Sequence, residues 1–306
     1  MGIILRIGTR ESQLAVWQAT QVKELLAKNG YAAELVYIKS EGDIDLKTPL
    51  YEMGVQGIFT RSLDIALLNN SIDIAVHSMK DVPTQLPEGI MQAAVLKRAS
   101  YKDLLVYKND IHFLNDFGSA AVIATSSIRR KAQWLNRYPH HRIENLRGNV
   151  NTRLKKVEES NWNGAVFAAA GLERIGLRPK NSIELDWMLP APAQGAIMVV
   201  CRTEDNMAFN ACASFNDATT ASCTKIERDF LRTLLGGCST PISALAEIKN
   251  EEVHFRGNIL SVDGKQKEEI EIMQPATNLK EMGKKAAEQL LRKGGQAIAD
   301  SIHHAG

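Results

Sequence analysis

The sequence predicts an α/β protein with two doubly wound domains, followed by a small α+β domain. Up to about residue 202, short apolar runs alternate with amphipathic segments of helical period, as in mostly parallel sheets that carry helices on their faces. From about residue 219, one helix pattern precedes three successive strand patterns and a closing helix pattern, which indicates an α+β domain. A length of 306 residues also favours two or three domains.

The opening third has the strand and helix signals of a first α/β unit. A looser stretch over 40–58 interrupts the pattern. The expected elements are a strand at 4–8, a helix at 12–30 that Gly30 ends, a strand at 33–40, a helix at 59–70 and a strand at 73–78.

The same alternation restarts near residue 100 and predicts a second α/β unit. Its apolar runs are separated by segments with two clear helical patterns. The expected elements are strands at 103–108, 121–127, 142–146 and 164–170, and helices at 127–138 and 149–160.

Residues 189–202 bring two prolines, a glycine and a new apolar strand, which most easily joins an existing sheet by returning to the first domain. We therefore expect domain 1 at 1–98 and 195–216, domain 2 at 99–194 and domain 3 at 217–306. In domain 3 we expect a helix at 220–237, strands at 242–250, 253–262 and 265–273, and a helix at 278–295.

Composition and charge restrict the possible functions. Hydrophobic residues make up 44% and charged residues 24%, which is typical of a soluble globular protein. The apolar run at the N-terminus is too short for a signal peptide or a membrane span, so we expect a cytoplasmic protein. Net charge is only +2, yet residues 121–180 hold twelve Lys and Arg against four Asp and Glu, which indicates an anionic ligand or an acidic neighbour.

We do not expect nucleic acid as the ligand of this basic stretch, because exposed aromatics are not interleaved with the charges and no nucleic-acid-binding module is recognisable. A zinc site is equally unexpected. The four cysteines lie 11, 11 and 15 residues apart without a CxxC pair, so we expect free thiols. They are Cys201, Cys212, Cys223 and Cys238.

Four polar stretches stand where predicted strands end and helices begin, the usual ligand position in open α/β sheets. These are residues 8–13, 77–83, 125–130 and 146–153. They are rich in arginine, whose planar fork matches a carboxylate, although a structural ion pair stays open for any single one. The arginines concerned, with one more from a following stretch, are Arg10, Arg129, Arg130, Arg147, Arg153 and Arg174.

Asp81 directly follows Lys80 where a predicted strand stops. An ionised carboxylate among cations could stabilise a developing positive charge or exchange a proton, and a loop-capping role is the alternative. We interpret His77 as a satisfied structural histidine.

Cys238 lies in GGCSTP, just beyond a predicted helix C-terminus, where the helix dipole does not lower a thiol pKa. Gly236 and Gly237 permit a left-handed turn, and Pro241 stops any continuation. This local pattern favours an exposed thiol, with a small buried residue as the alternative.

Taken together, GTRESQLAVWQA, VHSMKDVP, TSSIRRKAQ, LRGNVNTRLKK, AAAGLERIGL, LPAPAQGA and GGCSTP resemble the hydroxymethylbilane synthase, or porphobilinogen deaminase, family from residue 5 to about 246. The resemblance implies a transferase of tetrapyrrole, and hence porphyrin and haem, biosynthesis. Such an enzyme joins four porphobilinogen molecules head to tail, loses ammonia at each step and releases hydroxymethylbilane by adding water. It also implies a monomer that needs no metal or nucleotide.

The resemblance implies a dipyrromethane cofactor attached covalently through Cys238 and a catalytic role for Asp81. The positions matching cofactor contacts are Lys80, Asp81, Thr125, Ser127, Arg129, Arg130 and Arg147. Those matching substrate contacts are Arg10, Ser12, Arg147, Arg153 and Arg174.

One stretch departs from the family pattern, because many relatives carry lysines near Glu52 and at Gln56. We assign neither residue a role. The alternative class is a bilobal ligand-binding protein, since the two α/β domains also resemble periplasmic-binding-protein lobes; it predicts no covalent adduct, and its members are usually exported.

Overall fold

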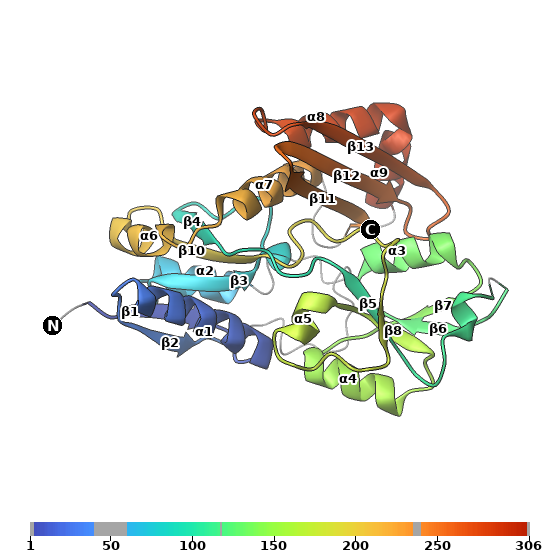
Figure 1. Ribbon diagram of the computed structural model, residues 1–306, viewed down its shortest axis with the longest axis horizontal. Coiled ribbons are helices and arrows are strands. Elements are labelled where there is room, and N and C mark those ends of the chain that lie inside the picture. Colours follow the sequence, from blue (N-terminus) through green and yellow to red (C-terminus); the bar gives the residue numbers. More distant parts are fainter. Residues whose placement is uncertain (1–2, 40–59, 117, 235–239, 305–306) are drawn as a thin grey trace. The chain divides into compact units, whose positions relative to one another are not determined.

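The computed structural model describes residues 3–39, 60–116, 118–234 and 240–304 (Figure 1). The chain divides into two compact units, and each is described by itself below. Of the described residues, unit 1 comprises 3–39, 60–99 and 195–222, and unit 2 comprises 100–116, 118–194, 223–234 and 240–304. The three domain boundaries drawn from the sequence stay a prediction.

Unit 1 is built on a five-stranded sheet in the order β2-β1-β3-β10-β4. Strand β1 pairs in parallel with β2 and β3, whereas β10 runs antiparallel to β3 and β4. The strands are β1 (Leu5–Thr9), β2 (Ala33–Tyr37), β3 (Ile74–Ser78), β4 (Ile90–Val95) and β10 (Ile197–Arg202).

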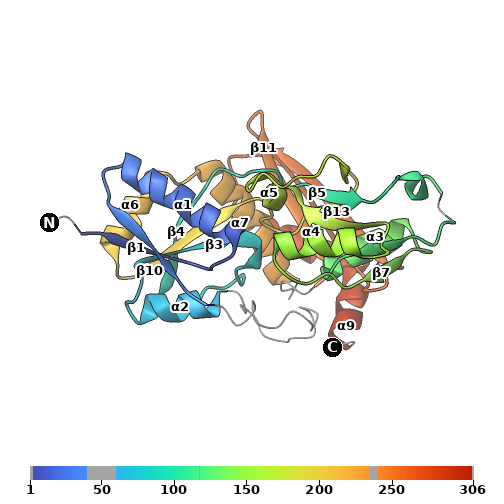
Figure 2. The ribbon, with the colours of Figure 1, turned by 90° about the horizontal axis from the view of Figure 1, so that it is seen from below.

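Helices cover both faces of this sheet, with α1 and α6 on one side and α2 on the other (Figure 2). In α1, the Ser12 side chain accepts a hydrogen bond from the Ala15 N–H at 3.4 Å and caps the first turn. Buried residues recur at helical spacing toward the sheet, which explains why this segment is a helix. The helices are α1 (Gln13–Lys28), α2 (Arg61–Leu68) and α6 (Asn206–Ala213), and a short 3₁₀ turn η2 (Met79–Asp81) follows β3.

Strand β10 joins the first sheet, as the sequence predicts. Its residues from Ile197 to Cys201 are all buried, and Val199 lies opposite Val76 of β3. An apolar strand of this kind needs neighbours on both edges and cover on both faces, which the position between β3 and β4 provides.

Unit 2 contains a second five-stranded sheet, in the order β7-β6-β8-β5-β9. Here β6 pairs in parallel with β7 and β8, and β5 is antiparallel to both β8 and β9. The two sheets therefore share one topology, with a single antiparallel strand at the fourth position. The strands are β5 (Asp103–Tyr107), β6 (Val122–Ala124), β7 (Arg142–Glu144), β8 (Gly164–Ala168) and β9 (Ser182–Glu184).

Apolar side chains cover both faces of this sheet, so it is doubly wound. Along β5, Leu104 and Val106 belong to one core cluster with α4, while Leu105 belongs to another with Trp134 of α3. The helices are α3 (Ile128–Arg137), α4 (Val150–Glu159) and α5 (Ala169–Glu173), with a 3₁₀ turn η3 (His112–Leu114).

The C-terminal segment forms a three-stranded antiparallel meander in the order β11-β12-β13, packed against helices through Phe230, Phe255 and their neighbours. The single closing helix expected from the sequence is instead interrupted at Gly294, whose φ of 133° favours glycine. The elements are α7 (Ala218–Thr233), β11 (Ile242–Lys249), β12 (Glu252–Leu260), β13 (Lys267–Pro275), α8 (Met282–Leu290), a π-helical turn η4 (Leu291–Gly295) and α9 (Gln296–His304). With the two doubly wound sheets, this segment confirms the predicted fold class.

Candidate functional site

Unit 1 places four of the predicted site residues at one edge of its sheet. Strands β1 and β3 are parallel neighbours, with Gly8 opposite Ala75, so their carboxyl ends meet at the same edge. Arg10 and Ser12 follow β1, and Lys80 and Asp81 form part of the turn after β3. All four side chains are half-buried, which leaves them accessible to a ligand. Cations and a carboxylate thus share the position where α/β sheets bind small molecules.

His77 lies just before this group on β3 and is buried, with 6% exposure. Burial, and secondarily the charge of Arg10, lowers the pKa of His77 to about 4, so the imidazole is neutral at pH 7. Its Nε2 atom has no hydrogen-bond partner among the described residues. The interpretation of His77 as a satisfied histidine is therefore wrong, although the residue is buried.

This histidine should make the protein less stable in acid. The pKa of His77 lies below the ordinary value of 6.5, so the unfolded chain binds a proton that the folded chain excludes. The contribution of neutral His77 to the free energy of unfolding is fully present above pH 6.5. As the pH drops toward 4, this free energy falls by about 2 to 3 kcal/mol. Urea unfolding at pH 7 and pH 4.5 measures the loss.

The variant His77→Gln should show a smaller fall between these two pH values, because glutamine does not titrate. His112→Gln is the matched control, since His112 is exposed. An equal acid-induced loss in the wild type and in His77→Gln would assign the effect to other groups.

Unit 2 repeats the arrangement at the carboxyl ends of β6, β7 and β8, which are neighbouring parallel strands. Thr125 follows β6, and its Oγ1 accepts a hydrogen bond from the Ser127 N–H at 3.2 Å. Ser127 caps α3 by accepting from the Arg130 N–H at 3.5 Å. At the next strand, Asn149 caps α4 through the Thr152 N–H at 2.9 Å. Two helix N-termini therefore lie at this edge, and such ends attract anions.

Three of the predicted arginines lie at the same edge. Arg147 is buried in the loop after β7, and the Arg153 Nε donates to the Gly148 carbonyl oxygen at 2.7 Å. Arg174 follows α5, and burial lowers its pKa to about 10. A guanidinium that has lost water is stabilised by an anionic ligand, so these positions suit carboxylates.

Arg129 and Arg130 lie in the first turn of α3, but both donate to a buried carboxylate that sequence reasoning missed. Asp103 is fully buried and accepts from Arg129 Nη2 at 2.8 Å and from Arg130 Nη2 at 2.7 Å. The available signal was a single acidic residue in an otherwise apolar strand, DLLVY. Both arginines therefore form the structural ion pair that the sequence leaves open as an alternative to ligand binding.

Cys238 lies outside the described residues, as do Glu52 and Gln56. The other three thiols, Cys201, Cys212 and Cys223, are buried. Burial raises the pKa of Cys201 to about 11 and that of Cys212 to about 12. Because the thiolate is the nucleophile, these two cysteines are poor candidates for covalent attachment.

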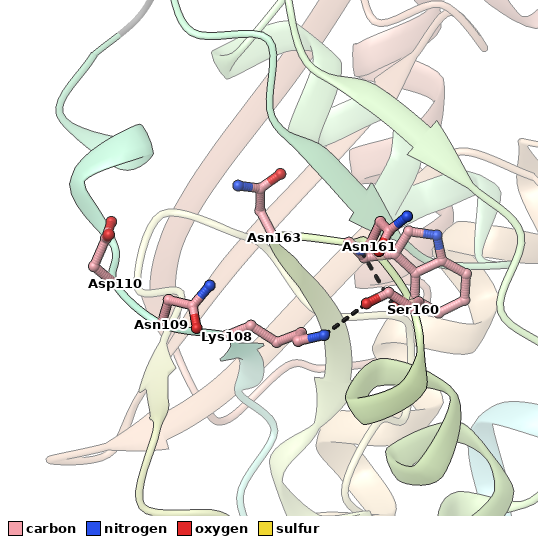
Figure 3. A pocket seen from close by; sticks show the side chains of 7 residues that line it. Lys108, Asn109, Asp110, Ser160, Asn161 and Asn163 are labelled. Atoms are coloured by element: carbon pink, nitrogen blue, oxygen red, sulfur yellow. Dashed lines mark hydrogen bonds between the residues drawn. The ribbon is translucent and has the colours of Figure 1, made fainter.

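A cavity of about 280 Å³ lies at the opposite edge of the unit 2 sheet (Figure 3). Lys108 and Asp110 line it, and the Lys108 Nζ donates to the Ser160 carbonyl oxygen at 2.6 Å. Because β5 is antiparallel to β8, this cavity is remote from the arginine-bearing edge and contains none of the predicted site residues.

Within the described part of the chain, no group of three or more His, Cys, Asp or Glu side chains is placed to hold a metal ion. The helices described there include none that is both long and apolar enough to cross a membrane.

The fold and these edges define a class: an α/β protein whose sheets each present cations and hydroxyls at the carboxyl ends of parallel strands, as suits an acidic small molecule. Residues 5–210 match the family model "Porphobilinogen deaminase, dipyromethane cofactor binding domain", and residues 221–292 match "Porphobilinogen deaminase, C-terminal domain". The chain belongs to the porphobilinogen deaminase family.

Curated relatives agree over nearly the whole chain. The porphobilinogen deaminase of Pelobacter propionicus is 39% identical over 98% of this chain and 97% of its own length. That of Trichlorobacter lovleyi is 40% identical over 98% of this chain and 96% of its own length. Among solved structures, an ancestral cationic amino acid solute binding protein is 16% identical with a TM-score of 0.44, covering 69% of this chain and 87% of that one.

Proposed function

We propose that this chain is a transferase that joins four porphobilinogen molecules head to tail and then releases hydroxymethylbilane by adding water. Each addition breaks the bond between the aminomethyl carbon and its nitrogen, which leaves as ammonia. The carbon bonds to the α-carbon of an acceptor pyrrole, whose proton is lost. The observation that carries this proposal is family membership across residues 5–210 and 221–292. The reaction belongs to tetrapyrrole, and so porphyrin and haem, biosynthesis.

Dipyrromethane, bound covalently through Cys238, is the proposed cofactor, and when bound it supplies the pyrrole to which the first porphobilinogen is joined. The donor set fits such a group, because its carboxylates match guanidinium groups, hydroxyls and helix N-termini. Arg129 also has a buried Nε with no acceptor among the described residues. The residues proposed to hold the cofactor are Lys80, Asp81, Thr125, Ser127, Arg129, Arg130 and Arg147.

Asp81 is the proposed catalytic residue. Loss of the amino group leaves positive charge on the pyrrole, which a nearby carboxylate stabilises, and the same carboxylate can accept the proton released when the rings join. The strand end after β3 sets Asp81 at the cation-bearing edge of unit 1. The residues proposed to bind substrate carboxylates are Arg10, Ser12, Arg147, Arg153 and Arg174.

We further propose a cytoplasmic monomer that needs no metal or nucleotide and binds neither nucleic acid nor membranes. Sedimentation of the purified protein tests the monomer. These statements rest on the resemblance of the chain to its family and on its near-neutral net charge of +2.

The purified wild-type protein tests the function directly. Intact-protein mass spectrometry should show a two-pyrrole adduct, and addition of porphobilinogen should release ammonia and yield hydroxymethylbilane. A bare polypeptide mass, together with porphobilinogen binding but no ammonia release, would favour the ligand-binding class instead.

A further inference from the structure

Asp103 is a buried carboxylate to which three side chains donate hydrogen bonds. Arg129 Nη2 donates to its Oδ2 at 2.8 Å. Arg130 donates to Oδ1 from Nε at 3.1 Å and from Nη2 at 2.7 Å, and Gln194 Nε2 donates to the same oxygen at 3.0 Å. The first turn of α3, the start of β5 and the segment after β9 are therefore joined at one side chain.

The two arginines differ in how many of their donors this arrangement uses. Arg130 has Nη1 bound to the Val166 carbonyl oxygen at 2.9 Å in addition to its two bonds with Asp103, so its guanidinium is fixed to the sheet. Arg129 has Nη1 bound to the Leu189 carbonyl oxygen at 2.7 Å. Its buried Nε, however, has no acceptor among the described residues.

Charge is also unbalanced here. Asp103 is the one carboxylate among the described residues that pairs with either arginine, so two buried guanidinium groups share one negative charge. Burial lowers the pKa of Arg129, and the charge of Arg130 acts in the same direction. An uncompensated buried cation costs free energy unless a partner supplies the missing charge.

Unit 1 contains a comparable cluster that is balanced. Asp73 accepts from Arg6 Nη2 at 2.8 Å and from Arg202 Nη2 at 3.2 Å, and Arg202 also pairs with Asp205 at 2.5 Å. Two carboxylates thus serve two arginines. The Asp103 cluster therefore carries an excess positive charge that an additional anion could neutralise, whereas the charges of the Asp73 cluster are already balanced.

We infer that Asp103 is a positioning residue for the acidic ligand of unit 2. It fixes Arg130 to the sheet. It also orients Arg129 so that the Nε and the uncompensated positive charge of Arg129 can bind a carboxylate of the ligand. The inference rests on the proposed function, because the carboxylates are those of the pyrrole rings. Gln194 supports the same carboxylate, and its Nε2 lies 2.7 Å from the Tyr101 carbonyl oxygen, so the position of Asp103 is set from both sides.

The test uses Asp103→Glu, which keeps the charge but moves the carboxylate by one methylene group. At a temperature where the variant is folded, we expect KM for porphobilinogen to rise about 10- to 100-fold, as displaced binding groups do, with a smaller change in kcat. Intact-protein mass spectrometry should show a lower fraction of cofactor adduct. Asp73→Glu is the matched control, with a lower thermal midpoint but wild-type KM and adduct fraction.

Gln194→Met serves if Asp103→Glu does not fold, because it removes one donor and leaves both arginines in place. It should raise KM several-fold and lower the adduct fraction in the same direction. Wild-type KM and adduct in whichever of these variants folds would overturn the inference, as would an equal rise of KM in Asp73→Glu. Failure of the wild type to carry an adduct or release ammonia would instead overturn the proposed function.

Discussion

Cys238→Ser should purify with the mass of the bare polypeptide and form no hydroxymethylbilane. A serine hydroxyl is rarely ionised at neutral pH and is a far weaker nucleophile than a thiolate, so the cofactor cannot attach. Turnover should fall by on the order of 10³-fold or more, as when a covalent nucleophile is removed. Intact-protein mass spectrometry and an assay of ammonia release measure the two effects.

Cys223→Ser is the matched control for this experiment. Cys223 lies on α7 and is buried in the core that α7 shares with the C-terminal sheet, with 4% exposure, so its replacement should lower the thermal midpoint and leave the adduct in place. A two-pyrrole adduct on Cys238→Ser would show that another group carries the cofactor, and the assignment of Cys238 would fail.

Asp81→Asn should retain the two-pyrrole adduct and lose most turnover. Asparagine keeps the size of the side chain and one of its two acceptor oxygens, but it carries no negative charge to stabilise a cation and does not accept a proton at neutral pH. We expect a fall in kcat of about 10²- to 10⁴-fold, the usual contribution of acid–base catalysis. Steady-state assays of ammonia release measure the fall.

Glu88→Gln provides the control, because Glu88 is an exposed carboxylate of the same unit. It should leave both adduct and turnover unchanged. Wild-type turnover in Asp81→Asn would remove this aspartate from the mechanism, whereas loss of the adduct in that variant would mean that Asp81 acts in cofactor attachment as well.

Much of the fold is predictable from local patterns, because the helical spacing of apolar residues in α1 reflects its buried face, and the continuous apolar run of β8 reflects a strand that is covered on both faces. The direction of β5 and β10 was not predictable in this way. Val199 pairs with Val76, far away in the sequence, and nothing within β10 itself encodes an antiparallel partner. Strand β9, at three residues, is too short to show a period.

The candidate site shows the same division. The arginines near strand ends are visible in the sequence, because Arg147 follows a strand pattern and Arg174 comes shortly after another, at the end of the short helix α5. Asp103 was missed, since its partner Arg129 lies 26 residues away and only the folded sheet brings them together. The roles of the site residues and the domain boundaries remain predictions. Cys238, the proposed site of cofactor attachment, lies outside the described residues.

The antiparallel strand in the first sheet has a consequence for how the protein is made. As the chain leaves the ribosome, β1 to β4 appear early, but β10 follows only after the whole of residues 100–194. Until then, the edges of β3 and β4 that pair with β10 have unpaired backbone N–H and C=O groups, and such exposed edges promote aggregation. The five-stranded sheet of unit 2 has all its strands before β10 is made, so of the two five-stranded sheets the one that begins earlier in the chain is completed later.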